Sequence, residues 1–264
     1  MTINYVKYSP TGNVTLLVTS PVPREDHGAV AAALLECLGG EQVGYVEPPR
    51  DDRAAARLQM MGGEFCGNAT MSLGALLARE AVAAHVVLEV SGSEGLVPCD
   101  IRRHGQGWVG TVKMPVPTAI RTVTLPRDGG MVTAPLVELP GIAHLILPMD
   151  GNLGEAQLRR RLPEWNAAIG ADALGALLWD EAASAIDPLV CVPSAGTLVR
   201  ENGCGSGSAA VGCWLARRSG HDVRADIRQP GGTIAVDARL RDGAFTSVSI
   251  TGRVTLVEEG QVDI

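Results

Sequence analysis

The sequence has few aromatic residues and no excess of positive charge. Phe, Trp and Tyr make up 3% of its 264 residues, so a surface that stacks nucleobases is not expected. Lys and Arg number 22 against 29 acidic residues, which gives a formal net charge of −7. Nucleic acids and anionic membranes both favour clusters of basic residues, so we expect neither as a partner.

Lysine is also scarce, because Lys7 and Lys113 are the only two. A pyridoxal phosphate enzyme holds its cofactor through a lysine, and neither lysine has a glycine-rich phosphate-binding segment beside it. The five histidines are scattered, without C-x-x-C or H-x-x-x-H spacing, so no metal site is predicted. No run of 18 apolar residues and no signal peptide is visible, so we expect a cytoplasmic protein with reduced thiols.

What the sequence does contain is an internal repeat. The segment Cys66 to Arg79 aligns with Cys204 to Arg217, and six of the fourteen positions are identical. Both segments have helical spacing of small and apolar residues, and β-rich stretches recur before and after them in the same order. This pattern predicts an α/β protein of two similar domains, residues 1–117 and 118–264, with the last strand able to return to the first domain.

Each repeat helix begins with Cys-Gly, at Cys66 and at Cys204. A thiol at a helix N-terminus meets unpaired N–H groups and the positive end of the helix dipole, so we expect lowered pKa values and thiolate character. The small or short residues that follow let a carboxylate approach the backbone, and they are Gly67, Asn68, Gly205 and Ser206. The remaining cysteines lack this context and are expected to be buried structural thiols: Cys37, Cys99, Cys191 and Cys213.

Two such halves, joined face to face, would place one cysteine on each side of a cleft. Inversion of the α-carbon of an amino acid needs a base on one face and an acid on the other, and a thiolate and a thiol can share that work. Backbone N–H groups would hold the substrate carboxylate and stabilise the charge that develops as the α-proton leaves. The chemistry requires no organic cofactor and no metal.

At this point the sequence resembles a known family. Glu64-Phe-Cys66-Gly-Asn-Ala and Asn202-Gly-Cys204-Gly-Ser-Gly are similar to the two signatures of the diaminopimelate epimerase superfamily of cofactor-independent racemases. The resemblance covers nearly the whole chain. It implies two pseudo-twofold-related α/β domains, each a curved mixed β-sheet around a central helix, with the site in the cleft between them. It also implies substrate-binding roles for Asn13, in a motif like the family's first, and for His144.

Departures from that family concern the substrate. Diaminopimelate epimerases carry an Arg eight residues before the second cysteine that grips the distal carboxylate, and Gly196 stands here. The cysteine motifs look closer to those of the histidine racemases of nicotianamine-like, staphylopine-type metallophore pathways. The favoured substrate is therefore histidine. Candidates to meet a basic or imidazole side chain are Glu47, Glu64 and Glu201.

Several alternatives stay open at this stage. Diaminopimelate or another free amino acid is the alternative substrate, and a phenazine-type isomerase, proline racemase or hydroxyproline dehydratase is an alternative in the same superfamily. Gly205-Ser-Gly-Ser-Ala-Ala210 also satisfies G-x-G-x-x-A, the outline of a dinucleotide site in an NAD(P)-dependent oxidoreductase. A non-catalytic amino-acid-binding module would use the same anion cradles. The sequence does not decide between a monomer and a homodimer.

Overall fold

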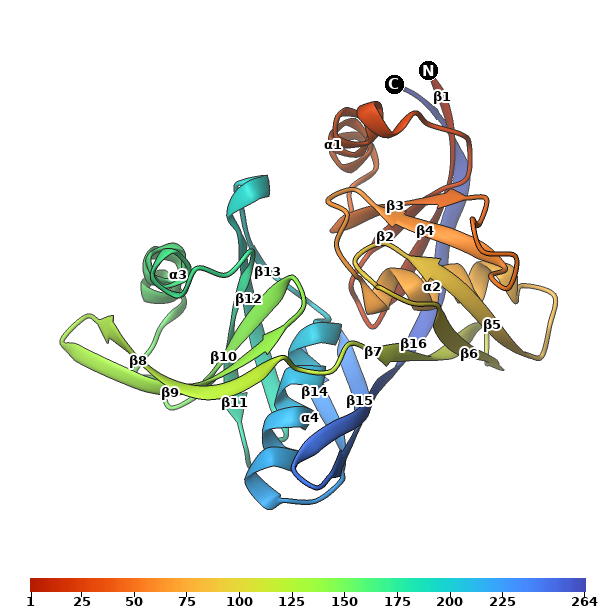
Figure 1. The fold of residues 1–264 in the computed structure, drawn as a ribbon. Coiled ribbons are helices and arrows are strands. Elements are labelled where there is room, and N and C mark those ends of the chain that lie inside the picture. The colour runs from red at the N-terminus through yellow and green to blue at the C-terminus, as the bar shows by residue number, and fades with distance from the viewer. The chain divides into compact units, whose positions relative to one another are not determined.

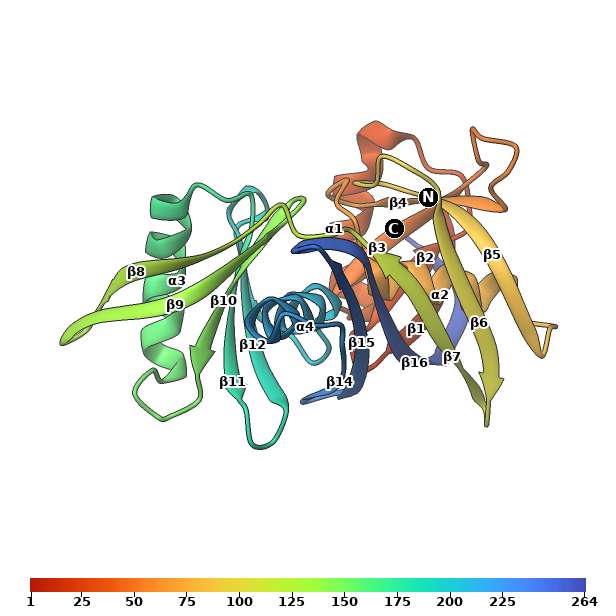
Figure 2. The same ribbon diagram turned by 60° about the horizontal axis from the view of Figure 1, so that its bottom comes forward.

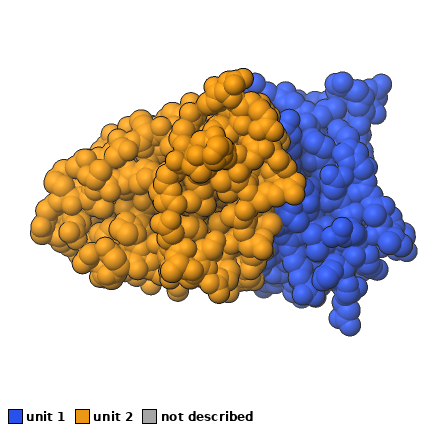
Figure 3. All heavy atoms as spheres, turned by 90° about the horizontal axis from the view of Figure 1, so that it is seen from below, with its two compact units in different colours: residues 1–113, 251–264 blue, residues 114–250 orange. Residues whose placement is uncertain are grey.

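The computed structural model describes residues 1–264, apart from the side chain at position 195. The chain divides into two compact units (Figure 3). Unit 1 comprises Met1–Lys113 and Thr251–Ile264, and unit 2 comprises Met114–Ile250. The division at Met114 lies near the expected boundary at residue 117, and the last part of the chain belongs to unit 1.

Unit 1 is a closed β-barrel. Its strands are neighbours in the order β1-β2-β3-β4-β5-β6-β7-β16, and β16 pairs antiparallel with β1, which closes the barrel and places Thr2 opposite Asp263. Figure 1 accordingly shows both chain ends on this unit. The elements are β1 Thr2–Pro10, β2 Thr15–Val18, η1 Arg24–Asp26, α1 His27–Leu38, β3 Gln42–Glu47, β4 Ala56–Met60, α2 Gly67–Leu77, β5 Ala83–Val90, β6 Val97–His104 and β7 Gly107–Met114. The long strand β16 (Ala244–Asp263) belongs to unit 2 up to Ile250 and to unit 1 from Thr251 onward.

Unit 2 repeats this topology. Its strand order is β8-β9-β10-β11-β12-β14-β15-β16, with β13 paired to β12. In both units each α-helix lies in the sequence between two strands that pair in parallel. These strand pairs are β2–β3 and β4–β5 in unit 1, and β10–β11 and β12–β14 in unit 2. The elements are β8 Ala119–Arg127, β9 Gly130–Leu139, β10 Ile142–Pro148, α3 Glu155–Ile169, β11 Leu174–Asp180, β12 Ala185–Val192, η2 Pro193–Ala195, β13 Thr197–Arg200, α4 Gly205–Ser219, β14 Val223–Gln229 and β15 Gly232–Arg241.

A cysteine-headed helix lies at the centre of each unit. In α2 every residue from Gly67 to Ala75 is buried, as a helix enclosed by a barrel must be. In α4 the buried residues run from Gly205 to Cys213 with one break, and α4 packs on β9, β10, β14 and β15 (Figure 2). The predicted curved mixed sheet around a central helix is confirmed in each unit.

Two glycines at equivalent repeat positions explain how closely these helices pack. A Cβ at Gly74 of α2 would lie 2.9 Å from the Cys99 Sγ, and a Cβ at Gly212 of α4 would lie 2.6 Å from a Val236 methyl carbon. Real Cβ atoms do not approach other atoms so closely, so each helix touches its sheet through a bare backbone. The identity of Gly74 and Gly212 in the repeat therefore reflects packing.

The sheet of unit 2 carries a different helix on each face. Ala143, Leu145 and Leu147 of β10 join Leu158 and Trp165 of α3 in one apolar core. His144 lies between two of these strand residues and faces the other side, where it meets Ser206 of α4, because successive strand side chains point to opposite faces. Thus α3 covers one face and α4 the other. Among the described residues no helix combines the length and apolar character needed to span a bilayer.

Candidate active site

Cys66 is the N-cap of α2, as the repeat predicts. Its backbone is extended (φ −132°, ψ 111°), and its sulfur accepts the N–H of Ala69 at 3.4 Å. The Thr70 hydroxyl donates to the Cys66 carbonyl at 2.7 Å, which ties the first turn to the cap. The thiol itself donates to Gln42 Oε1 at 3.1 Å. The helix start therefore holds this sulfur between one backbone donor and one amide acceptor.

Gln42 is a site residue that sequence reasoning missed. Its Nε2 donates to Asn13 Oδ1 at 2.6 Å and to Thr15 Oγ1 at 2.8 Å, while its oxygen faces Cys66. Asn13 in turn donates to Glu41 at 2.8 Å and is 4% exposed. Asn13, predicted to bind substrate, thus orients the amide that contacts the thiol. A polar residue at the start of a strand gives no signal of such a contact.

Cys204 is the N-cap of α4 in unit 2. Its backbone is extended (φ −98°, ψ 102°), and its sulfur accepts the N–H of Gly207 at 3.3 Å. A Cβ at position 207 would lie 3.0 Å from this sulfur, which explains why glycine stands there. The Cys204 N–H donates to Gln229 Oε1 at 2.6 Å, and the Gln229 amide donates to Ser208 at 2.8 Å.

The expected lowering of the pKa is wrong for Cys204. Burial raises the pKa of this thiol well above its ordinary value, and the nearby Glu201 carboxylate, which the thiol hydrogen-bonds, raises it further. Ser206 and the Gly207 N–H act in the opposite direction and are outweighed. The helix N-terminus does contribute its N–H group, but the thiolate of a residue that is 2% exposed loses more from desolvation than it gains from one donor. Cys204 is therefore a protonated thiol at neutral pH.

His144 and Ser206 form a polar pair beside Cys204. His144 Nε2 and Ser206 Oγ are 2.9 Å apart, and Ser206 Oγ is 3.6 Å from the Cys204 sulfur. The ring of His144 is fully buried, and burial lowers its pKa to about 3. Its Nδ1 has no hydrogen-bond partner among the described atoms and lies against Gly175 of the neighbouring strand. His144 is thus a neutral group that fixes Ser206.

The three candidate glutamates are separated. Glu201 lies beside Cys204. Glu64 lies on the loop two residues before Cys66, and desolvation raises the pKa of its carboxyl. The structure does not bring Glu47 to the Cys66 thiol, because Glu47 ends β3 about five residues, or roughly 16 Å, beyond Gln42. Glu47 instead pairs with Arg24 at 2.6 Å and Arg57 at 3.3 Å.

The small residues Gly67, Asn68, Gly205 and Ser206 occupy the first turns of α2 and α4, where a helix has N–H groups without helical acceptors. Gly67, Asn68 and Gly205 are buried, and Ser206 is partly exposed. The described residues contain no group of three or more His, Cys, Asp or Glu arranged for a metal. The residues of the suspected dinucleotide motif lie inside α4, where they pack against the sheet.

The other cysteines divide into two kinds. Cys99, Cys191 and Cys213 are buried, and burial raises the pKa of each. Cys37 is exposed, so the expectation that it is buried is wrong. Helical spacing puts it near the face of Val30 and Leu34, but it lies one residue before the end of α1, where its side chain is exposed.

Comparison with known proteins places the chain in a family. The family model described as the histidine racemase CntK N-terminal domain matches residues 2–262. The chain belongs to the histidine racemase family. The histidine racemase of Staphylococcus aureus is 30% identical over 279 residues, which cover 99% of this chain and 98% of the relative. A diaminopimelate epimerase of Acidiphilium cryptum is 28% identical over 98% of this chain and 96% of its own length.

Solved structures of related folds agree. A probable proline racemase from Agrobacterium radiobacter superposes with a TM-score of 0.73 at 16% identity, covering 99% of this chain and 93% of the other. A hydroxyproline epimerase from Agrobacterium vitis gives 0.72 at 16% identity, with 99% and 92% covered. Both likenesses confirm the predicted fold class. The family membership also confirms the suspected resemblance to the histidine racemases.

Proposed function

We propose that the protein is a cofactor-independent racemase that inverts the α-carbon of free histidine, with Cys66 and Cys204 as its acid and base. The observation that carries the proposal is the equivalence of the two sulfurs. Each is the N-cap of the central helix of its unit, and each accepts the N–H of the residue three positions later. A family of histidine racemases supplies the reaction class.

The chemistry needs one thiolate and one thiol. The thiolate takes the α-proton, so an S–H bond forms as the C–H bond breaks, and the electron pair moves into the substrate carboxylate. The second thiol then gives its proton to the opposite face of the α-carbon and becomes the thiolate. Backbone N–H groups at the helix N-termini, around Gly67 and Gly205, would bind the carboxylate and stabilise its added charge.

The two sulfurs begin this cycle differently. Cys204 is buried beside Glu201 and has a raised pKa, so it starts as the proton donor. Cys66 is less buried, and it is the proposed first base. Ser206, held by His144, faces the Cys204 sulfur and would donate to it once it has lost its proton.

The assignment of histidine rests on the family and on position 196. Gly196 has φ +63°, in the left-handed region where side chains are strained, and follows the short η2 turn. An arginine for a distal carboxylate would be disfavoured by this backbone. A substrate with a second charged amino-acid centre would therefore bind less well than one with a neutral ring.

The test is proton NMR in D₂O with reduced enzyme. We expect L-histidine to lose its Cα proton signal and to yield D-histidine on a chiral column. The panel also contains diaminopimelate, ornithine, lysine, glutamate and proline. Cys66→Ser and Cys204→Ser should each abolish racemisation, while Cys37→Ser, which alters the exposed thiol of α1, should keep full activity.

Each outcome tests a different part of the proposal. Exchange on diaminopimelate alone would overturn the substrate and keep the two-thiol chemistry. Histidine racemisation that survives either serine variant would overturn the two-thiol assignment. Histidine bound without exchange would show a binding module and end the racemase proposal.

A further inference from the structure

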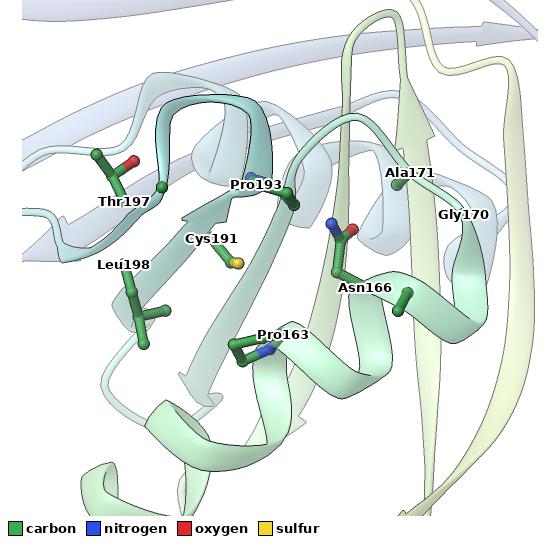
Figure 4. Close-up of a pocket in the computed structure, with 10 residues that line it drawn as sticks. Pro163, Asn166, Gly170, Ala171, Cys191, Pro193, Thr197 and Leu198 are labelled. Carbon is green, nitrogen blue, oxygen red and sulfur yellow. The ribbon is translucent and has the colours of Figure 1, made fainter.

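Unit 2 contains a second hollow on the face of the sheet that α3 covers. It has a volume of about 590 Å³ and lies between α3, β12, η2 and β13 (Figure 4). Pocket volumes of this size are typical of small-molecule sites. The side chains that shape it include Pro163, Thr197 and Leu198, and every described lining residue is uncharged.

One buried amide points into this hollow. Asn166 of α3 is 3% exposed, and its Oδ1 has no hydrogen-bond partner among the described atoms. Its neighbours on the same helix face, Leu162 and Trp165, belong to the apolar core. An unsatisfied buried amide is costly, so a polar side chain in this place indicates that something else pairs with it.

The second buried polar group of the hollow is the thiol of Cys191. It is 4% exposed on β12, and Figure 4 shows it and the Asn166 amide directed toward the same space from opposite walls. Burial raises its pKa, so it is a neutral thiol at physiological pH. With no charged residue in the wall, a charged ligand would lose its hydration without an ionic partner.

The hollow lies across the sheet from Cys204, although Gly196, the position that bears on substrate choice, is one of its lining residues. Cys191 and Leu189 belong to the core that packs under α3, whereas His144, Ser206 and Cys204 belong to the α4 face of the same sheet. A molecule in the hollow would therefore lie one sheet thickness away from the Cys204 sulfur.

We propose that this hollow, here named the α3 pocket, binds a small uncharged molecule with an apolar body and an amide-like edge. Such an edge places an N–H donor next to a carbonyl acceptor, so it pairs with both halves of the Asn166 carboxamide. Pro163, Ala167 and Leu198 would contact the apolar body. Lactams, pyridones and related heterocycles belong to this chemical class.

The test uses 2-pyridone as the probe and N-methyl-2-pyridone as its matched control. Labelled protein is titrated with each compound while the side-chain amide of Asn166 and the β-carbon of Cys191 are followed by NMR. We expect saturable shifts at both positions, with millimolar dissociation constants, as suits seven heavy atoms. Methylation removes the N–H, so the control should bind about tenfold more weakly.

Two substitutions on the exposed side of α3 keep the test independent of folding defects. Ala167→Phe fills the mouth of the α3 pocket and should abolish the shifts, whereas Ala168→Phe, exposed on the same helix outside the pocket, should leave them unchanged. No saturable shift would mean that water alone occupies the hollow, and this overturns the proposal. Equal affinity for both compounds, or binding that survives Ala167→Phe, overturns it as well. Neither readout depends on racemase activity.

Discussion

His144 makes the stability of the protein depend on pH. Burial lowers the pKa of its imidazole in the folded chain to about 3, against about 6.5 for an unfolded histidine. The direction in which stability changes with pH follows from proton uptake by the two states. Above pH 6.5 the ring is neutral in both states and its contribution is fully present. As the pH falls from 6.5 toward 3, the unfolded chain binds a proton at this histidine and the folded chain does not, so stability is lost.

The size of the effect can be worked out for two convenient pH values. Between pH 7.5 and 5.0 the free energy of unfolding should fall by about 2 kcal/mol through His144 alone. With a urea slope of about 2 kcal/mol per molar, the unfolding midpoint moves by about 1 M. Three of the four tryptophans lie in unit 2 (Trp165, Trp179 and Trp214), so tryptophan fluorescence reports the unit that holds His144.

The matched variant is His144→Gln, which keeps a polar side chain toward Ser206 but cannot titrate. The wild-type midpoint should fall by about 1 M more than the variant midpoint over the same pH range. Other groups that titrate are common to both proteins and cancel in the difference. Equal falls in the two proteins would refute the reasoning, and so would an NMR titration in which the His144 ring protonates near pH 6.

Three further outcomes follow from the same contacts. Gly175→Ala should lower the free energy of unfolding by about 3 kcal/mol in urea denaturation, because its Cβ would overlap the His144 ring. Ser206→Ala should raise the pKa of Cys204 further and move the pH–rate profile toward higher pH, whereas Ser206→Thr should restore it. Gln42→Met should cut the racemisation rate about tenfold without loss of folding, as measured by Cα exchange and circular dichroism, since it removes the amide that holds the Cys66 sulfur in position. An unchanged rate would show that this contact is not used.

The sequence was sufficient to predict the elements that repeat. Cys66 and Cys204 begin their helices at the N-cap, and the shared Gly74 and Gly212 mark the same close approach of helix to sheet. These features are local, or they recur at a constant offset, so a single chain reveals them. The uncharged turn at Gly196 was also visible as a departure from the family, although its positive φ was not.

Contacts between residues that lie far apart in the sequence could not be predicted from the sequence alone. Gln42 lies 24 residues before Cys66, and only the barrel brings its amide to the thiol. The pKa of Cys204 was misjudged for a similar reason. The helix N-terminus can be predicted from the sequence. The burial of the thiol and the nearby Glu201 carboxylate, which raise its pKa more than the helix N-terminus lowers it, depend on the folded unit. Glu47 was a plausible partner until its ion pairs with Arg24 and Arg57 were seen.

The divergence of the two repeats bears on how a racemase can work. Ala69 faces Gly207 in the alignment, Cys66 is less buried than Cys204, and the Gln42 amide beside Cys66 contrasts with the Glu201 carboxylate beside Cys204, so we propose that the two sulfurs differ in proton affinity. Two enantiomers have equal free energies in an achiral solvent, so the equilibrium constant of the proposed reaction is one whatever the thiols do. Unequal thiols instead decide which protonation form of the free enzyme is abundant, and hence which enantiomer it captures first. The raised pKa of Cys204 thereby favours the enantiomer whose α-proton faces Cys66.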